Sequence, residues 1–550
     1  MIVEKTLAGT GNWLDERFRG AKGLRTFFRK IFPDHWTFLL GEIALYSFVI
    51  LILTGTFLAF FFKPSMTDMV YHGTYVKLDG IHMSEAYAST LRISFDVRGG
   101  LLMRQIHHWA ADLFVAAILA HMLRIFFTGA YRKPREVNWL IGIVMLTLAL
   151  IEGLFGYSLP DDLLSGAGLR ITQGVLQSIP VVGTYLSFFL FGGQYPGHSI
   201  IPRMYILHVL LIPGLFAALI GAHLFIMFHQ KHTQMPGKGR TNRNVIGAPM
   251  YPYFMAKTGA FFLFVFAAVA LASTFAQINP IWVYGPYNPL AISAGSQPDF
   301  YMGMLEGALR VMPAWEWVIA GHTFAFNVFI PALLPLGLIF TAAALWPFLE
   351  QWITGDRREH HINDRPRNAP TRTALGIAAV SFYGVLWAEG ANDLIANHLD
   401  ISLFTVTEIA RVAVFAVPIL AYIITKRICL GLQRKDLYLL EHGVETGIIR
   451  QLPSGEFIEE TRPLSEEARA KLAVPERLEL PAGPTEVAEE EVPPPGLRGG
   501  VGRVKARLNK VLTETVPMNG RGANGHAPDG EHPPAAIGSP ERDGSEGGSE

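Results

Sequence analysis

The sequence predicts an all-α integral membrane protein with eight transmembrane helices, the first four forming a four-helix bundle, and a cytoplasmic, largely disordered C-terminal tail. Three observations support this fold class. Of the 550 residues, 50% are hydrophobic and only 17% are charged, whereas soluble proteins carry roughly a quarter charged residues. The apolar residues gather in long runs, and a helix needs about 20 of them to cross a bilayer. Residues 481–550 are dominated by Pro, Gly, Glu and Ser, a composition that cannot bury a core.

Eight apolar runs are suitable for membrane-spanning helices, and the seventh is the weakest. They occupy residues 38–62, 106–127, 139–159, 204–228, 259–276, 317–346, 374–388 and 403–425. The first run follows a segment with charges of both signs, so the sequence predicts no cleavable signal peptide. Insertion into the membrane must therefore use the spans themselves.

Basic residues predict the orientation of these spans, because cytoplasmic loops are enriched in Lys and Arg. They precede the first span and fill the loops after the second, fourth and sixth spans: Arg17, Arg19, Lys22, Arg25, Arg29 and Lys30; Arg132, Lys133 and Arg135; Lys231, Lys238, Arg240 and Arg243; Arg357, Arg358, Arg365 and Arg367. Both termini are then cytoplasmic. The connections 63–105, 160–203, 277–316 and 393–400 face outward.

This topology divides the chain into five parts. We expect a cytoplasmic N-terminal segment at 1–36, the four-helix bundle at 37–245 and a C-terminal membrane domain at 246–426 that contains the outward loop 277–316. A cytoplasmic extension at 427–480 and a disordered tail at 481–550 follow. Within the tail, the basic stretch 503–510 is compatible with a short amphipathic helix on the anionic inner leaflet, but a solvated run of charges is favoured.

The cysteine count limits the redox chemistry of the chain. Cys429 is the only cysteine, which excludes an internal disulfide, a cysteine-ligated iron–sulfur cluster, a zinc ribbon and a CxxCH haem attachment. Any redox centre in this chain must use histidine. Lys plus Arg and Asp plus Glu are balanced at 46 each, so net charge gives no argument for a nucleic-acid partner.

Four histidines lie inside the second and fourth spans, where ionisable side chains are costly and indicate function. His107 and His121 are 14 residues apart, which places them about 40° apart around a helix and about 21 Å apart along it. His208 and His223 are 15 residues apart, or about 60° around the axis. His107 can therefore face His208 near the outer side, and His121 can face His223 near the inner side. Two such pairs would bind two six-coordinate haems.

These histidines allow two other interpretations. A single histidine in a membrane helix is often a packing residue, but two helices with matched deep and shallow pairs make that reading weak. His108 and Met122 are also 14 residues apart, which allows a His/Met ligand set. We favour His107, because His108 and His121 differ by about 220° around the helix.

Glycines repeat the same spacing on the alternating helices. Gly41 and Gly55 lie in the first span and Gly142 and Gly156 in the third, and each pair is 14 residues apart. A glycine lets a flat macrocycle approach the backbone closely. Small residues also serve helix packing, but two pairs at this spacing favour a notch at each haem level.

Short motifs around the same helices match one family in combination. Arginines flank the histidines: Arg104 three residues before His107, Arg124 three after His121, and Arg203 five before His208. Residues 156–160 read Gly-Tyr-Ser-Leu-Pro, and residues 298–301 read Pro-Asp-Phe-Tyr. Together these motifs resemble cytochrome b, the core subunit of the quinol–cytochrome c reductases (cytochrome bc complex, complex III). The similarity extends to about residue 426.

The resemblance implies roles for these residues. His107 and His208 would hold the low-potential haem near the outer face, and His121 and His223 the high-potential haem near the inner face. The arginines would bind the haem propionates. The segment 298–301 resembles the Pro-Glu-Trp-Tyr signature of the quinol-oxidation site, and the inner segment around Lys257 resembles the quinone-reduction site.

Departures from the family pattern indicate a subgroup. Asp299 replaces the usual Glu and Phe300 the usual Trp, and the His208 to His223 spacing is 15 residues. With the long polar tail, these features resemble the actinobacterial cytochrome b, whose complexes oxidise menaquinol. Thr258 stands where an acid would follow Lys257, so His229, His232 or an acid elsewhere must be considered as the inner proton donor.

Quinol oxidation releases two protons, so the outer site needs an acceptor within hydrogen-bond reach of a quinol hydroxyl. Asp299 is the candidate, because its motif outweighs the alternative of an ordinary loop carboxylate. Tyr301 and Tyr157 are candidate hydrogen-bonding neighbours, and Glu306 is a candidate relay of protons to the outside.

The resemblance also implies partners. With one cysteine the chain cannot hold the iron–sulfur cluster, so a Rieske iron–sulfur protein and a cytochrome c subunit, which could carry two haems, are required. A homodimer, a supercomplex with cytochrome c oxidase and contact with membrane lipids in a bacterial cell membrane are expected on the same basis.

Two other function classes share some of these features. A di-haem membrane anchor of a dehydrogenase is usually smaller and lacks a long loop like that between the fifth and sixth spans. A secondary transporter also has many spans and intramembrane polar residues, but it has no need of four phased histidines and four phased glycines.

Overall fold

The fold is given by a computed structural model that describes residues 13, 15–17, 19–291, 297–473 and 497–516. Seven helices in these ranges are long and apolar enough to cross a membrane, and a helix pair bent by 67° supplies an eighth span. The membrane-spanning helical class predicted from composition is confirmed. The bent pair corresponds to the seventh and weakest predicted span.

The spans begin and end close to the predicted apolar runs. They are α3 (Leu39–Ala59), α5 (Gly100–Phe127), α6 (Glu136–Ser158), α9 (Ile200–Ile206) continued by η3 (Leu207–Leu211) and α10 (Ile212–Gln230), η4 (Met250–Phe254) continued by α11 (Met255–Phe275), α14 (Phe326–Thr354), α15 (Pro370–Glu389) with α16 (Asn392–Leu399), and α17 (Leu403–His442).

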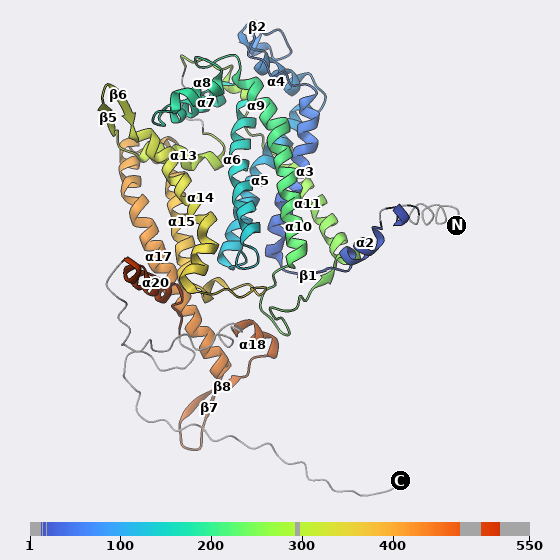
Figure 1. The fold of residues 1–550 in the computed structure, drawn as a ribbon, viewed down its shortest axis with the longest axis vertical. Helices are drawn as coiled ribbons and strands as arrows, with labels where there is room; N and C mark the ends of the chain where they lie inside the picture. Colours follow the sequence, from blue (N-terminus) through green and yellow to red (C-terminus); the bar gives the residue numbers. More distant parts are fainter. Residues whose placement is uncertain (1–12, 14, 18, 292–296, 474–496, 517–550) are drawn as a thin grey trace. The chain divides into compact units, whose positions relative to one another are not determined.

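The first four spans form a bundle in which α3 packs on α5 and α6 packs on α10 (Figure 1). The centre of this bundle is an apolar cluster that includes Phe114, Met122, Trp139 and Phe216, all buried. The helices α14, α15 and α17 lie together on the other side of α6, with α15 packed along α17. Most of the remaining apolar surface of the spans is exposed, as expected for helices that face lipid.

One end of the spans is covered by loops that the sequence predicts to face outward. These contain β2 (Asp68–Val70) paired antiparallel with β3 (His82–Ser84), η2 (Val76–Leu78), α4 (Glu85–Phe95), α7 (Leu163–Gln177), α8 (Gly183–Phe191), α12 (Ile281–Tyr284), η5 (Phe300–Met302), α13 (Gly303–Val311), and the hairpin of β5 (Glu316–Ile319) and β6 (His322–Ala325).

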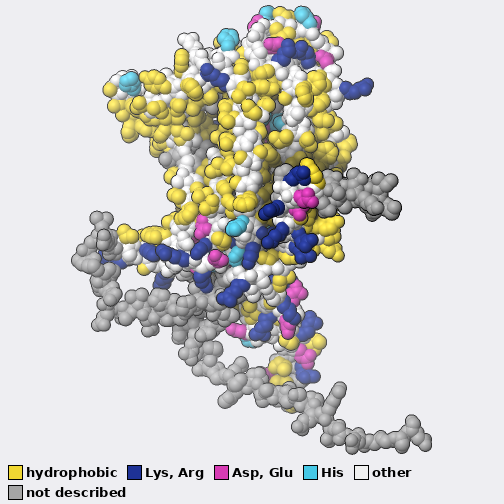
Figure 2. Space-filling model, turned by 45° about the vertical axis from the view of Figure 1, so that its right-hand side comes forward, with side chains coloured by type: hydrophobic (Ala, Val, Ile, Leu, Met, Phe, Trp, Pro, Cys, Tyr) yellow, Lys and Arg dark blue, Asp and Glu magenta, His cyan; other side chains and the backbone are white. Residues whose placement is uncertain are grey.

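The opposite end carries the N-terminal segment, the inner loops and the C-terminal extension. Its elements are α2 (Ala21–Phe28), β1 (Ile31–Phe32) paired antiparallel with β4 (Ala248–Pro249), η1 (Trp36–Phe38), η6 (Pro366–Asn368), the hairpin of β7 (Val444–Gln451) and β8 (Phe457–Arg462), α18 (Glu466–Leu472) and α20 (Leu497–Leu512). Figure 2 shows a broad hydrophobic surface over the spans, with Lys and Arg side chains gathered below it.

Besides shifts at other span ends, such as the start of the fifth span at Met250 instead of residue 259, three regions differ from the sequence predictions. The sixth predicted span starts at residue 317, but residues 316–325 form the β5–β6 hairpin and the helix begins at Phe326. Aromatic and β-branched residues such as Trp317 and Val318 favour a strand as readily as an apolar span. The eighth span continues to His442, because Lys, Arg, Gln and Leu are strong helix formers.

The third difference lies in the tail. Helix α20 lies within the segment predicted to be disordered, and it includes the basic stretch 503–510. The helix that the alternative reading requires is therefore present, whereas its basic side chains Arg503, Arg507 and Lys510 are exposed, as a solvated run of charges would be. The contact with the inner leaflet stays a prediction. Residues 481–496 and 517–550, the rest of the predicted disordered tail, lie outside the described residues.

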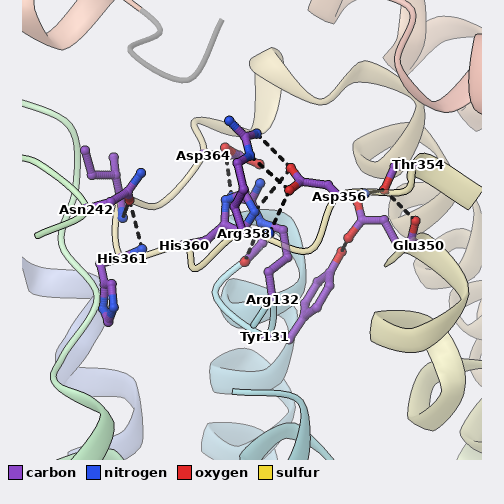
Figure 3. Close-up of polar contacts among 12 residues, drawn as sticks. Tyr131, Arg132, Asn242, Glu350, Thr354, Asp356, Arg358, His360, His361 and Asp364 are labelled. Atoms are coloured by element: carbon purple, nitrogen blue, oxygen red, sulfur yellow. Dashed lines mark hydrogen bonds and ion pairs between the residues drawn. The ribbon is translucent and has the colours of Figure 1, made fainter. Parts of the chain in front are cut away.

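A network of ion pairs holds the two groups of spans together at the inner end (Figure 3). Asp364 accepts from Arg132 at 3.0 Å and from Arg372 at 2.6 Å. Arg372 is also 3.3 Å from Glu350, which accepts a hydrogen bond of 2.6 Å from the Tyr131 hydroxyl. Because Arg132 follows α5 whereas Glu350 and Arg372 belong to α14 and α15, the network joins the bundle to the C-terminal spans.

Candidate functional site

The four histidines predicted from their spacing lie in two pairs inside the bundle. The ring centres of His107 and His208 are 6.2 Å apart, and those of His121 and His223 are 6.4 Å apart. A metal ion lies about 2 Å from a histidine nitrogen that binds it. Both separations therefore leave room for one ion between facing ring nitrogens, which fits two bis-histidine haems.

The unequal spacing of the two pairs has a structural cause. Residues 207–211 of the fourth span form η3, a single π-helical turn that contains His208. A π turn inserts one extra residue into an α-helix. It compensates for the fifteenth residue between His208 and His223, so this pair keeps nearly the same phase as the 14-residue pair on α5. Pro213 lacks the N–H that a regular ladder needs, which favours a break at this point.

The outer histidines are held through their Nδ1 atoms. Nδ1 of His107 is 2.9 Å from Oγ1 of Thr54, and Nδ1 of His208 is 2.9 Å from a carboxylate oxygen of Glu152. Such partners orient a ligating imidazole and leave its Nε2 free for a metal. In the inner pair, Nδ1 of His121 is buried and has no hydrogen-bond partner among the described residues.

Three of the four predicted glycines contact these histidines. A Cβ at Gly55 would lie 3.1 Å from the His107 ring, one at Gly156 2.5 Å from His208, and one at Gly41 3.0 Å from His121. A side chain at these positions would push the imidazole aside. Gly142 lines the inner cavity, and a Cβ there would meet no heavy atom within 4 Å. This open space agrees with a notch for a flat macrocycle.

Two of the three predicted arginines line the cavities. Arg104 lines the outer cavity and donates to the Ser94 hydroxyl at 2.8 Å. Arg124 lines the inner cavity, and its Nε and Nη2 atoms are buried without a hydrogen-bond partner among the described residues. A buried guanidinium without a partner is costly, so a bound anion such as a propionate fits this position.

Arg203 lies elsewhere. It is exposed and donates to the carbonyl of Leu190 at 3.0 Å, at the end of α8. Five residues of helix correspond to about 140° of rotation, so Arg203 and His208 point to different faces. Arg203 is not among the residues that line the outer cavity, and its propionate contact stays a prediction.

The outer cavity joins the histidine pair to the predicted quinol site. It has a volume of about 320 Å³, and its lining includes His107, His208, Asp299, Tyr301 and Tyr157. These residues come from α5, α6, the fourth span and the loop before α13. The sequence-predicted catalytic residues thus lie beside the outer histidines, except for Glu306, which is not part of the lining.

Asp299 is bound on both carboxylate oxygens. One oxygen is 2.8 Å from Nε2 of His108, and the other accepts a hydrogen bond of 3.0 Å from the Tyr301 hydroxyl. The Tyr301 side chain is buried, which raises the pKa of its phenol well above the ordinary value, and the negative charge of Asp299 acts in the same direction. Tyr301 therefore stays protonated and donates to Asp299.

Tyr157 and Glu306 lie near this pair in different settings. The Tyr157 ring packs edge-on against His108 with ring centres 6.3 Å apart, and its hydroxyl is buried without a partner among the described residues. Glu306 forms an ion pair with Arg310, which also contacts Asp393 at 3.2 Å. Burial raises the pKa of Glu306 and the Arg310 charge opposes that rise.

The inner cavity is smaller, about 100 Å³, and is lined by His121, His223, Arg124 and His232 among others. Burial lowers the pKa of His232 to about 4, so this imidazole is neutral near pH 7. His229 is exposed and does not line the cavity. Of the two histidines considered for the inner side, only His232 faces it.

Lys257 pairs with an acidic residue from a distant part of the chain, because its own segment has no acid. It forms an ion pair with Asp34, which lies 223 residues earlier, between β1 and η1. The neighbouring Thr258 contributes only its carbonyl, which accepts a hydrogen bond of 3.0 Å from Tyr46. Asp34 therefore stands near the place where Thr258 replaces the acid of the family pattern.

Sequence reasoning missed four residues of these sites. One is Thr54, whose partner His107 lies 53 residues away in the sequence. Asp112 lies with His108 and Asp299 in a cluster whose ligand atoms are within 4.8 Å of one another. The i, i+4 spacing of His108 and Asp112 on α5 was a detectable signal. Asp34 and Glu152 gave no such signal. The partner of Asp34, Lys257, is distant in the sequence, and the partner of Glu152, His208, was considered only as a haem ligand.

Comparisons with known proteins agree with this architecture. Residues 112–286 match the family described as cytochrome b (N-terminal)/b6/petB. A protein of Streptomyces coelicolor named cytochrome bc1 complex cytochrome b subunit is 55% identical over 86% of this chain and 87% of its own length. A protein of Mycobacterium leprae with the same name is 53% identical over 84% of both chains.

A solved structure titled "Hyperthermophilic respiratory Complex III" shares the fold. It has a TM-score of 0.57 at 22% identity and covers 76% of this chain and 99% of its own. Three findings lead to one assignment. They are the two histidine pairs, the eight-span fold, and relatives that are more than half identical over most of the sequence. This chain belongs to the cytochrome b family of integral membrane electron-transfer proteins.

Proposed function

We propose that this chain is the cytochrome b subunit of a respiratory quinol–cytochrome c reductase. It would oxidise a quinol at the outer side, and the resemblance of its sequence motifs to the actinobacterial subgroup favours menaquinol. One electron would leave to a Rieske iron–sulfur partner and then to a cytochrome c subunit. The other would cross the bundle and reduce a quinone at the inner side. The observation that carries this proposal is the shared outer cavity, which places Asp299 beside the His107–His208 pair.

When bound, two b-type haems would supply one-electron carriers at the outer and inner levels of the membrane. His107 and His208 would hold the outer haem, and His121 and His223 the inner one. Thr54 and Glu152 would fix the outer imidazoles through their Nδ1 atoms. The assignment of the ligands rests on the ring separations and on the glycines packed against three of the four rings.

Proton acceptance at the outer site is proposed for Asp299. A quinol hydroxyl must lie within about 3 Å of its acceptor, and Asp299 lines the cavity that a quinol would occupy. His108 and Tyr301 each hold one carboxylate oxygen, so they position the acceptor. Glu306, with Arg310, is proposed to pass the proton on toward the outer solvent.

Proton delivery at the inner site is proposed for the Lys257–Asp34 ion pair. Both side chains are partly exposed, at 45% and 71%, so they can exchange protons with water. Asp34 would supply the carboxylate that Thr258 cannot. His232, neutral near pH 7, would act there as a hydrogen-bonding group.

The division of the chain into segments is proposed as 1–36, 37–245, 246–426, 427–480 and 481–550, with quinol oxidation assigned to the loop 277–316. We further propose a bacterial cell membrane as the location, with both termini in the cytoplasm. The Lys and Arg side chains gathered at one end of the spans support this orientation (Figure 2).

The test combines spectra and turnover in the purified complex. Asp299→Asn should slow quinol oxidation about 100-fold or more, while the dithionite-reduced spectrum keeps two b-type haems per chain. His121→Ala or His223→Ala should remove one haem only. Retention of both haems in the histidine variants would refute the ligand assignment, and loss of haem in Asp299→Asn would show that the residue is structural.

A further inference from the structure

Helix α20 has no part in the proposed electron or proton path, yet it packs on the membrane-spanning unit. It contacts α14 and α15. The Thr371 hydroxyl at the start of α15 donates to the Val511 carbonyl at 2.6 Å, and Lys426 of α17 pairs with Glu514 at 2.5 Å. The ammonium group of Lys505 lies 5.7 Å from the ring centre of Trp352. Three residues in and just after α20, Lys505, Val511 and Glu514, are thus tied to three spans.

These contacts place α20 at the depth where the spans leave the apolar layer. Trp352 lies in the last turn of α14, and Thr371 lies in the first turn of α15. Tryptophan prefers the membrane–water interface. Above Trp352, α14 exposes Leu345 and Leu349, at 54% and 42%. In Figure 1, α20 runs beside the inner ends of the spans, at the level of the gathered basic residues in Figure 2.

The side chains of α20 divide into three faces at about 100° of rotation per residue. Lys505, Asn509 and Leu512 are half-buried against the spans. A stripe within about 80° of arc remains exposed although it is apolar: Val501 52%, Val504 55%, Leu508 40% and Val511 42%. Arg503, Arg507 and Lys510 form an exposed basic stripe within about 60° of arc. The basic stripe lies next to the apolar stripe and faces away from the spans.

An apolar stripe beside a basic stripe is the pattern of a helix that lies in the plane of a membrane interface. In water the four apolar side chains would stay solvated, whereas at the lipid boundary they continue the exposed apolar surface of α14. The basic stripe then meets the phosphate groups of anionic lipids. A soluble protein partner would not explain why the apolar stripe lies at the depth where the spans enter the bilayer.

We propose that residues 501–512 of α20 form an interfacial lipid-binding surface for anionic phospholipids. Its apolar stripe inserts among the acyl chains, and Arg503, Arg507 and Lys510 bind the headgroup phosphates. The assignment to the cytoplasmic leaflet rests on the orientation proposed above, but the lipid contact does not. This surface would anchor the C-terminal extension to the membrane next to α14 and α15.

The test is site-directed spin labelling of the full-length chain with its haems, in vesicles of phosphatidylcholine with and without phosphatidylglycerol. Cys429→Ala removes the native thiol, and single cysteines are placed at each residue from 501 to 512. With phosphatidylglycerol, the label in Leu508→Cys should be more accessible to oxygen than to a water-soluble nickel complex. The label in Ala506→Cys, on another face, should show the reverse.

The triple variant R503Q/R507Q/K510Q separates charge from apolar insertion. Each basic residue near an anionic surface contributes roughly a factor of five to binding, so the variant should lose the response of Leu508→Cys to phosphatidylglycerol. The proposal is overturned if the label at 508 is reached by the nickel complex in both vesicle types. It is also overturned if neither reagent reaches that label, which would indicate a protein contact.

A helical periodicity of accessibility along 501–512 would show that the helix stays folded in each variant. The dithionite-reduced spectrum of the same samples reports the haems independently. A failed lipid contact with an intact spectrum would therefore refute this inference without touching the proposed function.

Discussion

At the scale of single residues, glycines at van der Waals contact with imidazole rings set the geometry of the histidine pairs. Gly55, Gly156 and Gly41 leave 3.1 Å or less between an added Cβ and the nearest ring atom. Protein interiors are close-packed, so even one methyl group at such a position is felt. The glycines thus act as positioning residues for the histidines, whether or not they also make room for a macrocycle.

Gly156→Ala is the sharpest test at this scale. Its Cβ would lie 2.5 Å from Cε1 of His208, so the imidazole must move. We expect the outer haem to be lost or its spectrum to shift, while the inner haem stays. The matched control is Gly214→Ala on α10, where an added Cβ meets no heavy atom within 4 Å. There alanine should be neutral or stabilise the helix by up to about 1 kcal/mol. Equal spectra for both variants would contradict the positioning role.

At the scale of elements, the loop 355–369 joins the bundle to the C-terminal spans through the ion pairs of Asp364 with Arg132 and Arg372. Burial alone would raise the pKa of Asp364, but the guanidinium groups of Arg132 and Arg372 outweigh it, so the net pKa is lowered. Arg372 is 3% exposed and depends on this carboxylate and on Glu350 for its charge partners. Breaking such a buried pair leaves an uncompensated charge.

We therefore expect Asp364→Asn to lower the free energy of unfolding by about 3 kcal/mol or more, measured by thermal unfolding in detergent. The control Asp79→Asn removes an exposed pair with His72, 52% and 72% exposed, and should cost less than about 1 kcal/mol.

Because the folded pKa of Asp364 lies below its unfolded value of about 3.9, its contribution to the free energy of unfolding is fully present above pH 4 and is lost as the pH falls below that value. If the difference in free energy of unfolding between the wild type and Asp364→Asn stayed constant as the pH fell below 4, this assignment would be contradicted.

At the scale of the whole molecule, the Lys and Arg side chains gathered at one end of the spans support the proposed direction of the chain across the membrane. The orientation can be measured with single cysteines in a Cys429→Ala background. Lys77→Cys lies in an exposed outer loop and Ser454→Cys in the exposed turn between β7 and β8. A membrane-impermeant maleimide should label residue 77 in intact cells and residue 454 only after permeabilisation. The reverse result would overturn the proposed topology and, with it, the leaflet assigned to α20.

The sequence by itself determined the membrane class, the number of spans and the two histidine pairs, because helical periodicity converts spacing directly into a shared face. The π turn at 207–211 shows the limit of that argument: the 15-residue spacing became intelligible only when the structure revealed where the extra residue is absorbed. Arg203 shows a second limit, since a family motif gives its role but not its surroundings, and the structure places it exposed and outside the lining of the outer cavity.

Tertiary structure alone decided the contacts between residues far apart in the chain. Asp34 meets Lys257 across 223 residues, and Asp299 meets His108 across 191. No local pattern encodes such pairs, because they depend on which loops return to the same end of the bundle. The placement of α20 against α14 and α15 is of the same kind: composition suggested a solvated tail, whereas the structure packs this helix at the ends of the spans.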